Sequence, residues 1–332
     1  SFFISNFDVA MTQSRYLLAT VIIFFFLTLF WGIFTPQVLP NREANWVSGM
    51  YKVKEAKARS INESKLVIVS GSSGLFGLSA QNIESRLGIP TVNLATHAGL
   101  GAKYLLFRAR QSLRPGDIVL LALEYELLAP QEKFGSFLAG FVSAHDLRFA
   151  ANVPLAWIPG LLVGHDYKSF IWSIAERFGL WRYKQACYGS TRTLNEFGDE
   201  MCAETNKFKS GDLKRLFAQG VIKPEVINPS TLNPEILNFF HWARTKNVRV
   251  YLGFPPLFER SEYALISYKK SFDMLVRRLG NLDVTVLGKP ENFFYPAEYI
   301  YDTRYHLHSK GRDVHTNRML KLICEGGFVC TK

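Results

Sequence analysis

The sequence predicts an α/β protein: a three-layer sandwich with a central parallel sheet, preceded by one N-terminal transmembrane helix and carrying an inserted, aromatic-rich subdomain. Short β-branched runs alternate with helical segments after residue 64, which indicates parallel strands joined by helices. A long uncharged run lies near the N-terminus, and the alternation breaks between about residues 128 and 228. The expected division is an anchor over 1–37 and a domain over 38–332 that contains the insertion.

Composition excludes several classes of protein. The chain has 332 residues, 48% of them hydrophobic and 20% charged, which excludes a disordered chain. A mean hydropathy of +0.03 leaves no room for many membrane spans. The net charge of +11 raises the possibility of nucleic acid, but the sequence has no basic run with interleaved aromatics and no finger or helix-turn-helix signal. The basic residues gather at Lys52–Arg59, Lys103–Arg114 and Lys207–Arg215, which suits anionic lipid headgroups or acidic glycans, so we expect no nucleic-acid partner.

The apolar run extends from Tyr16 to Phe34 and contains nineteen residues without a charge. As a helix it would be about 28 Å long, close to the hydrocarbon thickness of a bilayer. Tyr16 and Trp31 lie near its ends, where aromatic rings favour the membrane interface. A cleaved signal peptide fits less well because its apolar region is usually only about 7–15 residues long. We therefore expect a single membrane span, with a buried core helix as the alternative; the flanking charges do not set its orientation.

The remaining segments follow in a regular order. A polar juxtamembrane stretch covers residues 38–63. The pattern predicts strands at 65–70, 90–94, 118–123, 248–254 and 284–287, and helices at 79–87, 101–113, 232–245 and 261–279. In such sheets ligands bind beyond the carboxyl ends of the strands.

The predicted insertion is rich in aromatic residues and includes Trp157, Trp172 and Trp181. It is expected to be partly helical over about 167–182. A lid, a membrane-resting surface, a partner interface and an ordinary subdomain core all remain open as its role.

Two segments far apart in the sequence carry the candidate chemistry. A Gly-Ser-Ser-Gly turn over residues 71–74 follows the first strand, where a serine hydroxyl would be exposed near backbone N–H groups. A phosphate-binding or purely structural turn is the alternative. Asp302 lies four residues before His306, close after the last strand, and could orient that imidazole as a base for the serine. His308 and His315 are nearby competitors for this role.

The order of these segments resembles the SGNH (GDSL-like) hydrolase superfamily, over about residues 65–126 and 230–325. In that family a Gly-Asp-Ser block ends on the nucleophile, which the resemblance places at Ser73, with Ser72 at the family's aspartate position. The Asp-x-x-His block is matched by Asp302 and His306, with one extra residue between them. The resemblance therefore implies a catalytic triad of Ser73, His306 and Asp302.

The resemblance also implies candidate positions for the oxyanion hole. The segment 92–99 resembles the family's second block, so its backbone glycine would fall at Ala95 or Gly99. The family's third block contains an asparagine, whereas this chain has Leu-Glu-Tyr-Glu over 123–126. Tyr125 and His97 are the candidate replacements for that asparagine.

Within the superfamily, the chain resembles the branch that contains the D-alanyl transfer protein of teichoic acid modification and the alginate O-acetylation proteins. This resemblance implies a serine O-acyltransferase that passes an acetyl or D-alanyl type of acyl group to a cell-envelope or secreted polysaccharide. It implies a polytopic membrane-bound O-acyltransferase as partner and a location on the outer side of the bacterial cytoplasmic membrane. No cofactor or metal is expected. An esterase of the same machinery and an inactive scaffold partner are the alternatives.

The four cysteines lack CxxC spacing, which does not favour a zinc or redox motif. In an oxidising envelope compartment two disulfides are expected, and four ordinary thiols are the alternative. Of the three possible connectivities, the local one would join Cys187 with Cys202 and Cys324 with Cys330.

Overall fold

The computed structural model describes residues 2–38, 42–131, 133–164, 171, 174–175, 178–180, 188–203, 210–328 and 330. The chain forms two compact units. One contains Ser1–Asn45 with Lys133–Tyr183, and the other contains Trp46–Glu132 with Lys184–Lys332. The segment expected as an insertion, 128–228, is therefore divided between the two units.

The larger unit contains a parallel sheet in the order β2-β1-β3-β4-β6. Its strands are β1 (Leu66–Val69), β2 (Thr91–Asn93), β3 (Ile118–Leu121), β4 (Arg249–Leu252) and β6 (Thr285–Val286). Neighbouring strands pair in parallel throughout, for example β1 with both β2 and β3. All residues of β1 and β3 are buried, which explains their unbroken apolar sequences. The predicted α/β class with a central parallel sheet is confirmed, and each strand lies within its expected range.

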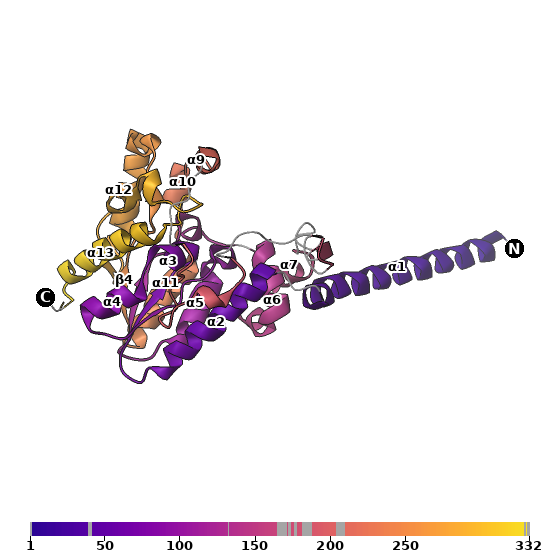
Figure 1. The fold of residues 1–332 in the computed structure, drawn as a ribbon. Helices are drawn as coiled ribbons and strands as arrows, with labels where there is room; N and C mark the ends of the chain where they lie inside the picture. The colour runs from indigo at the N-terminus through magenta and orange to yellow at the C-terminus, as the bar shows by residue number, and fades with distance from the viewer. Residues whose placement is uncertain are drawn as a thin grey trace. The chain divides into compact units, whose positions relative to one another are not determined.

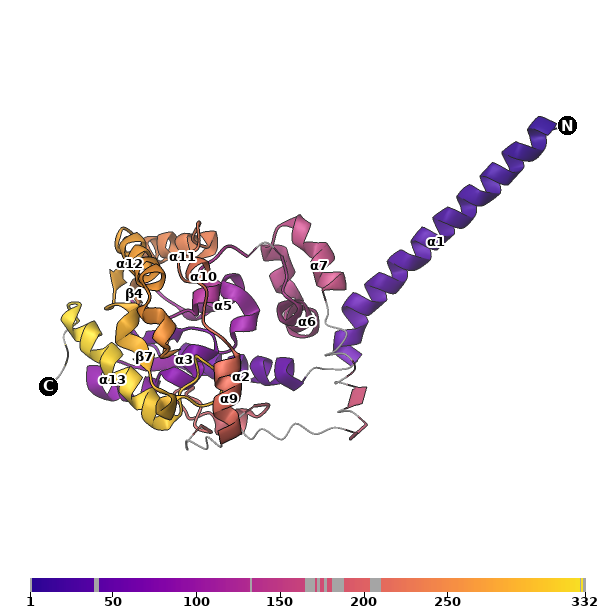
Figure 2. The same ribbon diagram turned by 90° about the horizontal axis from the view of Figure 1, so that it is seen from above.

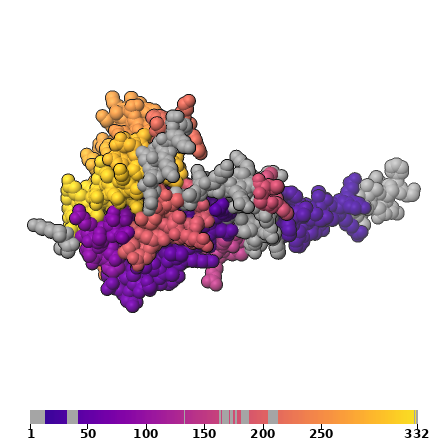
Figure 3. Space-filling model, viewed as in Figure 1, coloured from indigo at the N-terminus to yellow at the C-terminus, as the bar shows by residue number. Residues whose placement is uncertain are grey.

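Two groups of helices pack with this sheet (Figures 1 and 2). In one group α5 (Gly101–Ser112) packs against α11 (Pro234–Thr245), and these helices contact β1 and β4 respectively. In the other group α13 (Ser309–Glu325) contacts α3 (Ser72–Gly77) and α4 (Ala80–Leu87). Figure 3 shows the C-terminal segment, in yellow, against the purple segment around α4. This arrangement fits a three-layer sandwich.

Local sequence signals explain where these helices begin and end. The Ser79 hydroxyl caps α4 by accepting the Asn82 N–H, and Gly88 ends the helix with a left-handed φ of 65°. Asn233 caps α11, whose first residue is Pro234. These signals are the reason that both helices match their predicted ranges closely.

Two long helices were not predicted. The stretch expected as polar and juxtamembrane is largely α2 (Arg42–Ser60), which buries one face through Trp46, Val47, Met50 and Tyr51. The many charged residues in the second half of the helix, from Lys52 to Arg59, hide its helical period in the sequence. Helix α13 was also missed, although it follows the predicted Asp–His segment directly.

Shorter elements complete the larger unit. Helix α12 (Ile266–Gly280) covers most of the last predicted helix, and β5 (Leu257–Phe258) pairs with β7 (Phe294–Tyr295) in a second small sheet. Two further short helices are α9 (Ser210–Ala218) and α10 (Pro224–Ile227). The 3-10 turns are η1 (Ala98–Leu100), η2 (Tyr125–Leu127), η5 (Thr191–Thr193), η6 (Ser261–Ala264), η7 (Pro290–Phe293) and η8 (Ala297–Tyr299).

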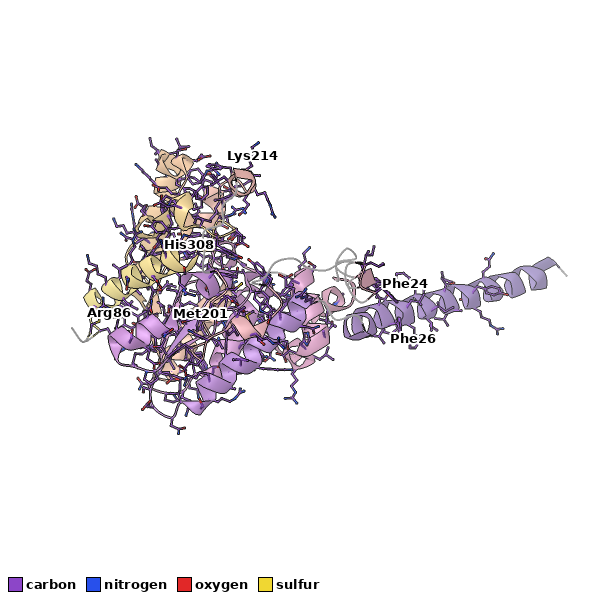
Figure 4. The ribbon with its side chains drawn as sticks, in the orientation of Figure 1. Phe24, Phe26, Arg86, Met201, Lys214 and His308 are labelled. Atoms are coloured by element: carbon purple, nitrogen blue, oxygen red, sulfur yellow. A yellow bond between two sulfur atoms is a disulfide. The ribbon has the colours of Figure 1, made fainter. Side chains whose placement is uncertain are left out.

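The smaller unit combines α1 (Phe2–Val38) with α6 (Ser136–His145), α7 (Ile158–Val163), η3 (Leu147–Asn152) and η4 (Leu155–Trp157). Within α1, the segment Gln13–Trp31 is long and apolar enough to cross a membrane, and a signal sequence near an N-terminus meets the same description. Phe24 and Phe26 project from this helix and are 71% and 61% exposed (Figure 4). Trp157 is buried, whereas Trp172 and Trp181 lie outside the described residues, as does most of the helix expected over 167–182.

The structure joins Cys324 to Cys330 in a disulfide with a Cα–Cα distance of 5.7 Å. Cys202 is also disulfide-bonded, and Cys187, its expected partner, lies outside the described residues.

Candidate active site

A cavity of about 380 Å³ lies where the segments that follow β1 and β3 meet the C-terminal loop that precedes α13. This is the edge of a parallel sheet at which ligands usually bind. The lining residues come from segments separated by more than 200 positions; the polar ones used below are Ser72, His97, Glu124, Glu126, Arg304 and His306.

Asp302 and His306 are in direct contact, with 2.7 Å between Asp302 Oδ1 and His306 Nδ1. Because the carboxylate accepts this hydrogen bond, the proton belongs on Nδ1 and the lone pair remains on Nε2. Burial would raise the pKa of Asp302, but the adjacent His306 and the hydrogen bonds from His306 and Tyr188 hold it below its ordinary value. The Phe76 ring stacks on the imidazole at 4.5 Å and fixes its plane.

The backbone of the C-terminal loop explains how the extra residue between this aspartate and histidine is accommodated. The Tyr301 N–H donates to the His306 carbonyl at 2.7 Å, and the His306 N–H donates to the Thr303 carbonyl at 3.2 Å. Gln219 clamps the loop from outside, because its amide donates to the Asp302 carbonyl and accepts from the Arg304 N–H. The loop is thus a closed turn that presents both side chains to each other.

Tyr188 was not singled out from the sequence, although it contacts the same pair. Its hydroxyl donates to Asp302 Oδ2 at 2.6 Å and lies 3.1 Å from His306 Nδ1. The ring packs against Trp46 and Phe76. Tyr188 therefore holds the second carboxylate oxygen of Asp302, and no local spacing in the sequence reveals this contact.

The structure does not bring Ser73 to this cavity. Its side chain is fully buried, and its hydroxyl lies 2.9 Å from the Ser70 hydroxyl, which itself donates to the Ala122 carbonyl. Ser72 is the serine that lines the cavity with His306. Successive residues of a helix point about 100° apart, so the two serines in the first turn of α3 cannot share one direction. This geometry does not fit the predicted role of Ser73 and favours Ser72.

Glu124 occupies the position between β3 and η2 and is only 2% exposed. Its carboxyl accepts the Ser73 N–H on Oε1 at 2.8 Å and the Gly71 N–H on Oε2 at 3.3 Å. A Cβ on residue 71 would lie 2.6 Å from both oxygens and 2.7 Å from the backbone Cα of Ala98, which explains the glycine there. Burial raises the pKa of Glu124, and the hydrogen bonds from Ser73 oppose this effect.

The four residues predicted for the oxyanion hole do not lie together in the structure. The Ala95 N–H donates to Asn93 Oδ1, and the Gly99 N–H donates to His97 Nδ1. Tyr125 is fully buried and packs on Phe272 rather than lining the cavity. His97 does line it, and Gly99 lines an adjoining cavity of about 220 Å³.

His308 and His315, the other candidates for the catalytic base, form their contacts outside the cavity. His308 Nδ1 caps α13 through the Lys310 N–H, and its Nε2 lies 2.5 Å from the Glu298 carbonyl oxygen. His315 is fully buried beside Tyr295, and burial lowers its pKa to about 3. Across the part of the chain that the structure describes, no group of three or more His, Cys, Asp or Glu residues could hold a metal ion.

No protein-family model matches this chain, and no curated protein matches it. Among solved structures, the chain is similar to the crystal structure of the protein YxiM from Bacillus subtilis, with 11% sequence identity and a TM-score of 0.32. The alignment covers 81% of this chain and 58% of that one, so the chain spans less than two thirds of the length of YxiM.

Proposed function

We propose that the chain is a membrane-anchored serine acyltransferase in which Ser72 is the nucleophile, His306 the base and Asp302 the residue that orients it. The acyl group would be of the acetyl or D-alanyl type, and the acceptor a hydroxyl of a cell-envelope or secreted polysaccharide. One observation carries the proposal: Ser72 and His306 line the same cavity, while Asp302 holds the Nδ1 side of the imidazole.

The reaction would proceed in two half-reactions. His306 Nε2 takes the proton of Ser72 as Oγ bonds to the carbonyl carbon of an acyl ester or thioester, and the departing alcohol or thiol then takes that proton. A sugar hydroxyl next attacks the acyl-serine and gives its proton to Nε2, from which it returns to Ser72 Oγ. Water in place of the sugar hydroxyl would make the same residues an esterase.

The apolar segment of α1 supports membrane attachment. Tethering would raise the effective concentration of the enzyme near a membrane-bound acyl donor. The proposal includes a polytopic membrane-bound O-acyltransferase as that donor-side partner, on the outer side of the bacterial cytoplasmic membrane.

The nucleophile is tested by labelling the detergent-solubilised full chain with a fluorophosphonate and mapping the modified peptide. We expect the label on Ser72, its loss in Ser72→Ala, and strong slowing in His306→Ala. Ser73→Ala is the matched control because its hydroxyl faces Ser70 in the core. If the Ser72→Ala variant is still labelled and the Ser73→Ala variant is not, the nucleophile is Ser73. A folded wild-type chain that takes no label would favour the inactive scaffold.

Transfer is separated from hydrolysis with a chromogenic acetate ester. Acyltransferase activity requires that added oligosaccharide become esterified and that release of free acetate fall in proportion. Unchanged acetate release at all acceptor concentrations would identify an esterase.

A further inference from the structure

The carboxyl group of Glu124 lies against the backbone on both sides of the proposed nucleophile. It accepts N–H groups from Gly71 and Ser73, the residues that flank Ser72. Glu124 also lines the cavity that contains Ser72 and His306. Any substrate atom bonded to Ser72 Oγ would therefore react close to this carboxyl group.

An ionised carboxylate at this position would oppose the reaction. Attack on an acyl carbonyl creates a negative oxygen beside Ser72, and a buried carboxylate close to that oxygen would repel it. A cation could neutralise Glu124, but in the described part of the chain no Lys, Arg or His nitrogen forms an ion pair with it. A neutral carboxyl group has the opposite effect, because its O–H is a hydrogen-bond donor.

The two carboxyl oxygens are held unequally by the backbone. Oε1 accepts the Ser73 N–H at 2.8 Å, an ordinary hydrogen-bond length, whereas Oε2 is 3.3 Å from the Gly71 nitrogen. The neutral form would keep Oε1 as the acceptor for Ser73 and carry its proton on Oε2.

We propose that Glu124 acts in the protonated state, donating its carboxyl O–H to the oxyanion that forms when Ser72 attacks an acyl carbonyl. This inference rests on the proposed function and adds a catalytic acid to it. No atoms are exchanged in this step: the proton stays on Glu124, and the hydrogen bond forms with the oxyanion and is lost when the carbonyl re-forms.

The surroundings of Glu124 agree with a neutral state. Burial disfavours the ionised form and raises the pKa of Glu124. Hydrogen bonds from Ser73 and from the backbone of Glu124 itself oppose this rise, and the charge of Glu126 adds to it. The other titratable or charged side chains that line the cavity around it are His97, Arg304, Tyr305 and His306.

The test compares two substitutions in the full chain, with kcat/KM for a chromogenic ester measured between pH 5 and 10. Glu124→Gln keeps an oxygen to accept the Ser73 N–H and supplies an N–H donor at every pH, although it gives up the 3.3 Å hydrogen bond from the Gly71 N–H. We expect it to retain activity within about tenfold of wild type at neutral pH. We expect Glu124→Ala, which lacks the donor, to lose about 100- to 1000-fold, the usual cost of removing an oxyanion-hole donor.

The pH profile gives the decisive difference. Wild type should lose activity on the alkaline side as Glu124 ionises, and Glu124→Gln should not show this loss. Glu200→Gln is the matched control, because burial also raises the pKa of Glu200 but its side chain bonds Thr193 outside the cavity; this variant should keep the alkaline decline.

Two outcomes would overturn the inference. One is an active wild type whose Glu124→Gln variant is as impaired as Glu124→Ala, because an ionised carboxylate would then be required. The other is a wild-type rate that does not fall at alkaline pH, a measurement that needs no variant to fold. A wild type that hydrolyses and transfers nothing would instead contradict the proposed function.

Discussion

Tyr188 reaches Asp302 from a position 114 residues earlier in the chain, and its hydroxyl donates to that carboxylate beside the imidazole of His306. A hydrogen bond to a charged group typically contributes about 1.5–3 kcal/mol. Tyr188 therefore helps to keep Asp302 ionised and correctly placed against His306, and we regard it as a positioning residue.

Replacing Tyr188 with phenylalanine removes this donor and leaves the ring. The pKa of Asp302 should rise, because one of the hydrogen bonds that holds it down is lost, and an NMR titration of the Asp302 carboxyl group measures this change. We expect kcat/KM to fall about tenfold to a hundredfold, as measured with a chromogenic ester. Tyr268→Phe in α12 is the control for a Tyr-to-Phe change outside the site. A rate loss with an unchanged pKa of Asp302 would contradict the role given to Tyr188.

Single residues of the site differ in how far the sequence could predict them. Asp302 and His306 lie four positions apart, and the structure brings them together as expected. The choice between Ser72 and Ser73 depends on the residue at which α3 begins, and a shift of one residue rotates the side chain by about 100°. Glu124 and Tyr188 act through contacts between distant segments, which spacing along the chain does not reveal.

Among the secondary-structure elements, the pattern of buried residues determines which strands and helices could be located from the sequence. Strands β1 and β3 are buried throughout, so their apolar runs were sufficient to locate them. Helix α2 was missed because lysines and glutamates stand between its buried positions, and one of them, Lys54, is itself fully buried with its Nζ on the Ala95 carbonyl. Burial lowers the pKa of Lys54 to about 7, so this lysine is not part of the basic surface inferred from the sequence.

Asp199 is a main link between the segment 188–203 and the sheet with its helices. Asp199 is fully buried and accepts the Ala80 and Gln81 N–H groups at 2.7 and 3.1 Å, at the start of α4. It also accepts from the Ser79 hydroxyl and the Asn93 amide. At its other end this segment meets α13, where the Ser309 N–H donates to the Ala203 carbonyl; Figure 4 labels Met201 and His308 in this region.

We predict that Asp199→Ala lowers the free energy of unfolding by about 3 kcal/mol, because a buried donor left without an acceptor costs about 1–3 kcal/mol. Chemical denaturation of the detergent-solubilised chain measures this change. Asp313→Ala provides the control, since Asp313 bonds the Asn82 side chain at the exposed surface of the same region and should change stability by less than about 1 kcal/mol. Equal losses in the two variants would mean that Asp199 does not anchor the segment.

For the whole molecule, the net charge of +11 is less available to partners than the sequence indicated. Arg108 and Lys103 lie in one of the basic clusters, yet they pair with Glu55 and Glu235. Such internal pairs cannot be located from composition, because both partners are distant in sequence. The apolar segment of α1, in contrast, is evident from composition alone.

Membrane attachment through α1 is tested by one substitution. Ile22 lies at the middle of Gln13–Trp31, and an arginine at the centre of a spanning helix costs about 2.5–3.5 kcal/mol of insertion free energy. We expect the wild-type chain to stay in the membrane pellet after an alkaline carbonate wash and Ile22→Arg to be released in part, with Ile22→Leu behaving as wild type. Equal retention of the arginine variant would exclude α1 as the anchor.

The close approach of Gly71 to Glu124 links two positions that are 53 residues apart. A side chain at 71 would meet the Ala98 Cα as well as the carboxyl group of Glu124, so residue 71 should remain glycine in related chains that keep this carboxyl group. The pairing of glycine at 71 with a carboxyl side chain at 124 is a sequence signature. Chains with the same arrangement around the serine could be recognised by it when overall identity is too low to align them.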